Sequence, residues 1–171
     1  MKSLLFTCFL LHTLLAMAQH THHPAPKATP PPASPKAVVK AFLAEVRSGR
    51  APEKAALYMA PTVLAHQVNA EDETTVQRSP GQYADHIREF LVLYGNYAFE
   101  VTELIAEGDK VYARWKQTGK HLAPIDGHAP TGKPLVEIAS AVYRLENGKI
   151  AEYWIQIDRL GLEAQLKRQA R

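Results

Sequence analysis

The spacing of apolar residues divides the chain into a helical first part and an extended second part. Ser34-Pro35 is typical of a helix N-cap followed by proline at the first helical position, and apolar residues then recur at helical spacing until Ser48-Gly49. A short second helix is expected from Ala51, and a third from Ser79-Pro80 to Gly95-Asn96. The folded domain is therefore expected to begin with three helices.

After Asn96 the apolar period changes from helical to two, which indicates strands. The strands are expected over residues 97–107, 110–121, 135–146 and 149–158, followed by a last helix over 159–169. Earlier, the pattern predicts a short extended segment over 62–68 and a polar loop over 69–78. Residues 122–134 are rich in Pro and Gly and form a candidate lid or pocket rim. Helices followed by long strands indicate an α+β fold, with helices on one face of a bent antiparallel sheet.

The last predicted strand has one apolar face and one mixed face. The apolar face carries Ala151, Tyr153, Ile155 and Ile157, and the mixed face carries Glu152, Trp154, Gln156 and Asp158. An indole, an amide and two carboxylates suit a partly solvated concave pocket better than full exposure to solvent or a core without water. We therefore expect the mixed face to line a small-molecule pocket, with the rest of the chain as its scaffold.

The first 18 residues read as a secretory signal peptide. Met1-Lys2 is a short positive segment, residues 4–15 are apolar, and Ala16-Met17-Ala18 is a cleavage site of small residues before Gln19. The apolar run is too short for the roughly 20 residues that span a bilayer. We expect export to the periplasm or outside the cell, with no stable membrane insertion after cleavage. A lipoprotein alternative would place the lipid on Cys8, which lies too early.

Residues 19–34 are expected to form an extended Pro/His-rich tether, and residues 35–171 the domain. His20, His22 and His23 could hold a transition metal loosely, although the tract has no carboxylates. Cys8 is the only cysteine, so a mature chain would have no disulfide, thiolate metal site or thiol nucleophile.

Charge and motifs exclude several further functions. The formal net charge of +3 is small and evenly spread, which argues against a nucleic-acid partner. No serine nucleophile elbow, phosphate-binding glycine loop or dinucleotide fingerprint occurs, so no cofactor is expected. His121, Asp126 and His128 lie near the long loop, but their spacing is not that of a rigid metal site.

Several short motifs resemble the SnoaL-like polyketide cyclase family of the nuclear transport factor 2-like superfamily. In chain order they are Glu107-Gly108-Asp109-Lys110-Val111, Arg114-Trp115, Thr118-Gly119, Pro130-Thr131-Gly132-Lys133, Tyr143-Arg144, Asn147-Gly148-Lys149-Ile150, Glu152-Tyr153-Trp154, Asp158-Arg159-Leu160-Gly161-Leu162 and Gln165-Leu166. The resemblance runs from about Ser34 to Leu166. It implies a cone-shaped, strongly curved antiparallel sheet wrapped by N-terminal helices, with an internal pocket and a homodimer formed through the convex sheet face.

The resemblance also implies roles for single residues. Asp158 matches the aspartate that serves the cyclases as acid and base in an intramolecular aldol closure, although its place before the last helix also suits a helix cap. His66 matches a family histidine that could orient a carboxylate, and a buried structural histidine is an equal alternative. Arg144 stands where a histidine partner of the aspartate is expected. It could hold a substrate carboxylate or form an ion pair with Glu152.

The predicted catalytic residues are therefore Asp158 and His66, and the predicted substrate-binding residues are Trp154, Arg144, Trp115, Gln156 and Glu152. Trp115 and Tyr143 could equally be pocket wall or core. The sequence predicts an exported protein that binds or converts a small, largely apolar organic molecule by carboxylate acid/base chemistry. A ligand-binding module without catalysis and a homodimeric interaction module are the alternatives.

Overall fold

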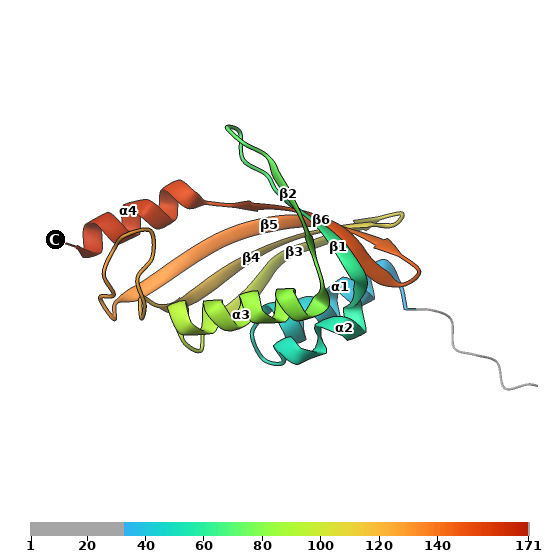
Figure 1. Ribbon diagram of the computed structural model, residues 1–171, viewed down its shortest axis with the longest axis horizontal. Coiled ribbons are helices and arrows are strands. Elements are labelled where there is room, and N and C mark those ends of the chain that lie inside the picture. Colours follow the sequence, from blue (N-terminus) through green and yellow to red (C-terminus); the bar gives the residue numbers. More distant parts are fainter. Residues whose placement is uncertain (1–32, 171) are drawn as a thin grey trace, which may run out of the picture. The chain divides into compact units, whose positions relative to one another are not determined.

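The computed structural model describes residues 33–170, and the structural statements below refer to those residues. The predicted signal peptide, Cys8, the histidines of the tether and Arg171 lie outside them. Figure 1 shows the N-terminal helices grouped on one side of a long curved sheet and a further helix at the C-terminal end. The expected α+β fold class is confirmed.

The helices begin and end close to the predicted positions. They are α1 (Pro35–Phe42), which continues as a π-helical turn over Leu43–Arg47, then a 3₁₀ turn over Pro52–Lys54 with α2 (Ala55–Tyr58), α3 (Pro80–Tyr94) and α4 (Arg159–Gln169). Ser34 caps α1, and Ser79 forms a reciprocal capping box with Gln82 at the start of α3. Local capping chemistry therefore fixes both helix starts.

Six strands form one sheet in the order β2-β1-β6-β5-β4-β3. Their bounds are β1 (Met59–Gln67), β2 (Thr74–Arg78), β3 (Ala98–Glu107), β4 (Lys110–Lys120), β5 (Pro134–Glu146) and β6 (Lys149–Ile157). Neighbours pair antiparallel except β1 and β6, which run parallel, so the expectation of a wholly antiparallel sheet fails for that pair. Asn147 and Gly148, both at positive φ, make the turn between β5 and β6.

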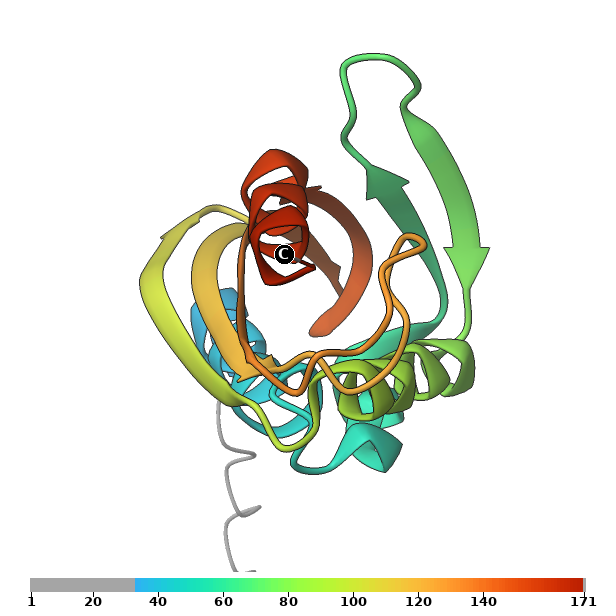
Figure 2. The same cartoon turned by 90° about the vertical axis from the view of Figure 1, so that its left-hand side faces the viewer.

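The predicted loop over residues 69–78 is partly wrong, because it contains the edge strand β2. Thr74 to Gln77 are exposed on both faces, so this strand has no buried side to give an alternating pattern. It is held by backbone pairing with β1 from Arg78 opposite Val63 to Thr74 opposite Gln67. Figure 2 shows this β1–β2 hairpin projecting from the rest of the sheet.

The core lies between the curved sheet and the first three helices. Buried rings of Phe42, Tyr83, Tyr143 and Tyr153 contact one another there, with ring centroids 5.3–6.1 Å apart. Gly119 on β4 lets the end of α3 approach the sheet, since a Cβ atom at this position would lie 2.5 Å from the Tyr94 carbonyl oxygen. The helices therefore pack directly onto the concave face.

Helix α4 follows β6 and binds the part of β5 that extends beyond the end of β6. The Gln165 side chain accepts from the Val136 N–H and donates to the Val136 carbonyl, at 3.0 and 2.8 Å. These bonds satisfy a β5 backbone that β6 no longer reaches. Leu166, on the buried side of α4, packs in one apolar cluster with Tyr94, Ile125 and Leu135. Within residues 33–170, no helix has the length and hydrophobicity needed to cross a bilayer.

Candidate functional site

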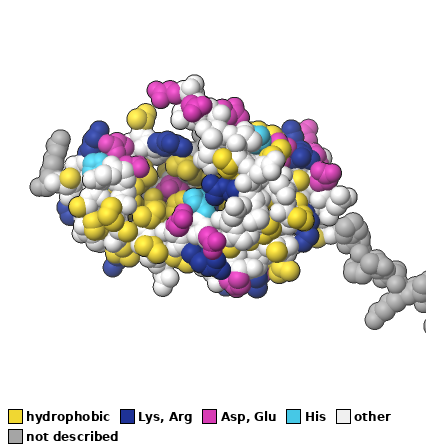
Figure 3. Space-filling view, viewed as in Figure 1, with side chains coloured by type: hydrophobic (Ala, Val, Ile, Leu, Met, Phe, Trp, Pro, Cys, Tyr) yellow, Lys and Arg dark blue, Asp and Glu magenta, His cyan; other side chains and the backbone are white. Residues whose placement is uncertain are grey.

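A pocket of about 310 Å³ opens on the concave side of the sheet. Its walls come from the π-helical turn after α1, from β1, β2, α3, β5 and β6, and from the start of α4. The lining residues are Arg47, Gln67, Val76, Arg78, Tyr83, His86, Phe90, Tyr143, Tyr153, Ile155, Ile157 and Arg159. Figure 3 shows a hollow in the molecular surface with apolar side chains in its depth and basic and histidine side chains at its edge. The volume is that of a small organic ligand.

Two local periodicities bring the walls together. Tyr153, Ile155 and Ile157 share one face of β6 because strand side chains alternate. Tyr83, His86 and Phe90 follow at three- and four-residue spacing, so they share the face of α3 that meets the sheet. The apolar side of β6 is therefore pocket wall as well as core.

A buried polar network forms one end of the pocket. Arg47, 2% exposed, donates to Gln117 Oε1 at 3.0 Å and to Glu137 Oε1 at 3.3 Å, and the Tyr94 hydroxyl donates to Glu137 Oε2 at 3.2 Å. The guanidinium also lies 4.6 Å from the centre of the Phe90 ring. Burial raises the pKa of Glu137, while the Arg47 charge opposes that shift. Arg47 is thus a cation fixed by its partners.

His86 is the histidine of the pocket wall. Its Nδ1 lies 3.3 Å from Glu89 Oε2, and its ring meets the Phe90 ring edge to face at 4.9 Å. Burial lowers the pKa of His86, and the positive charge of Arg78 lowers it further. The imidazole is therefore neutral at neutral pH and able to accept a proton.

Three tyrosines of the wall remain protonated. Burial raises the pKa of Tyr83, Tyr143 and Tyr153, so their phenolic groups are neutral hydrogen-bond donors at physiological pH. The pocket thus combines an apolar lining, neutral hydroxyl groups, a neutral imidazole and a buried cation.

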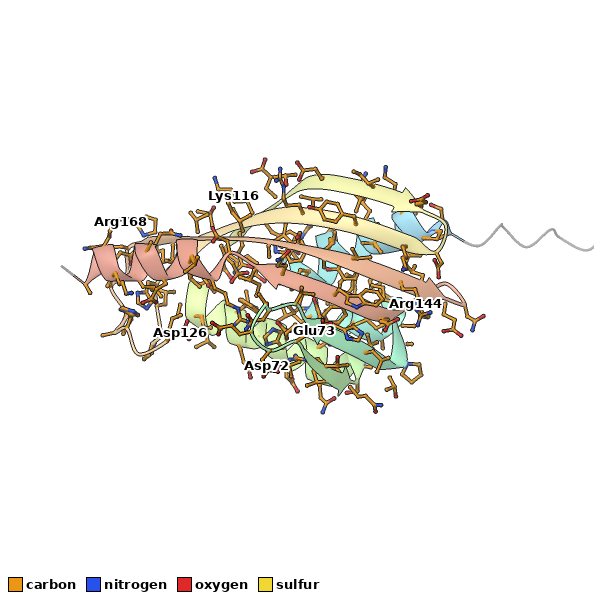
Figure 4. The ribbon with its side chains drawn as sticks, turned by 90° about the horizontal axis from the view of Figure 1, so that it is seen from above. Asp72, Glu73, Lys116, Asp126, Arg144 and Arg168 are labelled. Carbon is orange, nitrogen blue, oxygen red and sulfur yellow. The ribbon has the colours of Figure 1, made fainter. Side chains whose placement is uncertain are left out.

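The prediction that the mixed face of β6 lines the concave pocket is wrong. Glu152 and Trp154 lie on the opposite side of the sheet, where Glu152 accepts from Arg144 Nε at 2.7 Å and is 2.9 Å from His66 Nε2. The His66 ring stacks on Trp154 at 4.9 Å, and Lys110 lies above the same indole. Figure 4 views the molecule from above and labels Arg144, which lies near β6. Alternation identifies two faces but not which one is concave.

Asp158 is placed as the N-cap of α4. Its Oδ1 accepts from the Gly161 N–H at 2.9 Å, which is the capping arrangement that its sequence position also allowed. Asp158 and Gln156 border shallow depressions outside the concave pocket, one of them with Arg114, Ile138 and Ser140. Their predicted roles in chemistry and binding remain predictions, at a place separate from the pocket.

Trp115 is fully buried on β4 and takes part in the core rather than the pocket wall. Its Nε1 and the Nε2 of Gln117 have no hydrogen-bond partner among the described residues. The expected rim loop over residues 122–134 also contributes no lining residue, since Ile125 packs beneath α4 instead. The pocket rim comes from the β1–β2 hairpin and the start of α4.

Sequence reasoning missed Arg47, Arg78, His86 and Arg159. Arg47 carried a usable signal, because it extends the buried stripe of Val39 and Leu43 at four-residue steps. His86 had a similar signal beside Tyr83 on the buried face of α3. Arg78 and Arg159 had none, because pairing between distant segments brings them to the pocket.

The histidines near the long loop have other contacts. His128 Nε2 lies 3.4 Å from Glu163, whereas His121 Nδ1 lies 3.5 Å from the Thr131 hydroxyl. Asp126 is exposed in the loop (Figure 4). In the part of the chain that the structure describes, no three His, Cys, Asp or Glu side chains gather in a metal-binding arrangement.

Solved structures of similar fold include several candidate polyketide cyclases. One from Acidithiobacillus ferrooxidans is 24% identical with a TM-score of 0.69, covering 80% of this chain and 97% of its own. IdmH from Streptomyces antibioticus, also a candidate cyclase, is 22% identical with a TM-score of 0.65, covering 79% and 99%. TsrD from Streptomyces laurentii is 26% identical with a TM-score of 0.62, covering 75% and 91%.

None of the curated proteins matches the sequence. The family model for SnoaL-like polyketide cyclase matches residues 37–166, which include every residue of the concave pocket. The sequence motifs, the curved six-stranded sheet and this match agree, and the chain belongs to the SnoaL-like polyketide cyclase family.

Proposed function

We propose that the protein binds and converts a small, largely apolar organic molecule in the concave pocket, with His86 as the proton-transferring group. The observation that carries this proposal is a pocket of about 310 Å³ whose mostly aromatic and aliphatic walls contain a neutral imidazole. Family membership supports a small-molecule binding or cyclase/isomerase role.

The arrangement suits proton transfer at a carbon next to a carbonyl group. The neutral His86 imidazole can remove the proton, and the Arg47 guanidinium can stabilise the negative charge that develops on the oxygen. Such charge stabilisation is effective because the buried cation is already held by Glu137 and Gln117. Aldol closure and double-bond isomerisation both pass through such an enolate.

Pocket occupancy is the first test. Native mass spectrometry of the full chain purified from its own cells is expected to reveal a bound small molecule that denaturation removes. Val76→Trp places an indole at the pocket edge and is expected to abolish the adduct. Val92→Trp, at a position 65% exposed on α3, is the control and is expected to retain it. An adduct of equal abundance in both variants would place the ligand elsewhere.

Catalysis is tested separately from binding once the ligand is identified. His86→Gln is expected to lower turnover by about 10²-fold or more while the adduct persists, because general acid/base catalysis contributes about that much. His128→Gln changes a histidine outside the pocket and is expected to keep full turnover. Loss of turnover in Asp158→Asn but not in His86→Gln would move the chemistry to the predicted carboxylate. Full turnover in every variant would place the catalytic group elsewhere, and a ligand that the unmodified chain binds but does not convert would favour binding without catalysis.

Two further proposals concern the setting of the pocket. The signal-like sequence over residues 1–18 supports export, and detection of chains beginning at Gln19 outside the cytoplasm would test it.

The exposed Ile105 and Ile138 point away from the core on β3 and β5 and support a homodimer through the convex face. Light scattering at micromolar concentration is expected to give twice the chain mass, and a monomer would contradict the dimer.

A further inference from the structure

We propose that the ligand of the concave pocket carries an oxyanionic group, such as a carboxylate, which Arg78 and Arg159 bind at the pocket edge. This inference rests on the proposed function and names the class of molecule that the pocket selects. The apolar body of the ligand occupies the chamber between α3 and β6, and its charged end faces the two arginines.

The charges of the pocket wall are unbalanced. Its lining includes Arg47, Arg78 and Arg159 but no aspartate or glutamate. Arg47 is bonded to the buried Glu137. Within residues 33–170, neither the Arg78 nor the Arg159 side chain has a hydrogen bond or ion pair with another residue. The pocket edge therefore has two cations in excess.

Most other arginines of the described residues have a carboxylate partner. Arg88, Arg114 and Arg144 form ion pairs with Asp85, Glu103 and Glu152 respectively. Arg50 and Arg168 also lack ion pairs among the described residues; they are solvent-exposed, as Arg159 is, but unlike Arg159 they lie outside the pocket. Arg78 is half-buried, so part of its hydration is lost without a protein acceptor in return. A ligand oxyanion would supply that acceptor.

Arg78 lines the pocket at the end of β2. Its positive charge lowers the pKa of His86 on α3 and opposes the burial-induced rise in the pKa of Tyr153 on β6. These two residues belong to different walls, so Arg78 acts on both from the end of β2. Arg159 reaches the same pocket from the first residue of α4.

Neither Glu89 nor Asp158 forms an ion pair with these two arginines. Glu89 contacts His86 at 3.3 Å and does not line the pocket. Asp158 precedes Arg159 and borders a separate depression with it, but it caps α4 through the Gly161 N–H and does not line the concave pocket. Val76, Ile155 and Ile157 contribute apolar surface to the same pocket. A molecule with an apolar body and one charged end matches this division.

Two fluorescent probes with the same ring system test the inference. 8-Anilinonaphthalene-1-sulfonate carries a sulfonate, whereas N-phenyl-1-naphthylamine is neutral. Fluorescence titration of the full chain is expected to give about tenfold tighter binding of the sulfonate, since charge-assisted hydrogen bonds to partly exposed arginines are of that order. The double variant Arg78→Gln/Arg159→Gln is expected to bind both probes equally, with the neutral probe unaffected. Arg78→Gln alone is expected to lose more than Arg159→Gln, because Arg78 is the more buried.

Arg50→Gln/Arg168→Gln removes the same net charge at exposed positions outside the pocket and is the matched control. It is expected to retain the preference for the sulfonate, and thermal unfolding of each variant checks the fold. Equal binding of the two probes by the unmodified chain would overturn the oxyanion inference and leave the apolar pocket intact. An equal loss of sulfonate affinity in both double variants would also overturn it. Binding of both probes to the concave pocket should be blocked by Val76→Trp. If neither probe shows binding that this substitution blocks, the proposed function is overturned together with the inference.

Discussion

Two clusters of similar residues lie on opposite faces of the sheet. The convex cluster contains His66, Trp154, Glu152 and Arg144, and the concave cluster contains His86, Phe90, Glu137 and Arg47. Each combines an imidazole, an aromatic ring, a carboxylate and a guanidinium. Only the concave cluster borders the roughly 310 Å³ pocket.

The two clusters differ in what surrounds them, because only the concave one has an open volume and, within residues 33–170, an arginine without a partner beside it. On the convex face, the Glu152 carboxylate is within hydrogen-bond distance of both His66 and Arg144, and the His66 imidazole stacks on the Trp154 ring. On the concave face, Arg47 is held by Glu137, while the nearby Arg78 has no partner among the described residues. A cluster whose groups are all paired and covered acts as structure, whereas one that borders an open volume and an unpaired arginine can take a ligand.

The largest effect is expected from breaking the buried ion pair. Glu137→Gln leaves the Arg47 charge buried with weaker partners and is expected to lower the free energy of unfolding by about 3 kcal/mol or more. Urea denaturation measures this loss. The double variant Arg47→Met/Glu137→Leu is expected to recover part of it, because no uncompensated charge remains. A double variant as unstable as Glu137→Gln, or less stable, would contradict this account.

A smaller effect is expected from the convex cluster. Glu152→Gln weakens the bonds to His66 and Arg144, and the expected loss is about 1 kcal/mol, since these side chains are partly exposed to solvent. Ligand occupancy by native mass spectrometry is expected to be unchanged. Loss of the ligand in this variant, with the fold intact, would show that the convex cluster belongs to the binding site.

The smallest effect is expected in the pH dependence of stability. The lowered pKa of His86 means that the unfolded chain binds a proton at a higher pH than the folded chain does. The His86 contribution is therefore fully present above its ordinary pKa of about 6.5 and is lost as the pH falls below that value. His86→Gln is expected to flatten the decline in melting temperature between about pH 6.5 and 5. His128→Gln is the comparison, and identical slopes in the two variants would exclude His86 as the source.

Much of the fold could be predicted from local chemistry. Ser34-Pro35 and Ser79-Pro80 start helices as expected, and Asn147-Gly148 forms the expected turn. β2 could not be predicted, because its stability comes from pairing with β1 at the sheet edge rather than from its own pattern. The parallel pairing of β1 with β6 likewise joins segments distant in the chain.

The sequence by itself determined the helices, the long strands, the family and the two-faced nature of β6. The tertiary structure decided which face is concave, because sheet curvature depends on how all six strands and the covering helices pack. It also brought Arg47, Arg78 and Arg159 to one pocket from three separate elements. Alternation and capping are local and can be read from neighbouring residues. The charges of residues distant in sequence come together only through the tertiary fold of the whole chain.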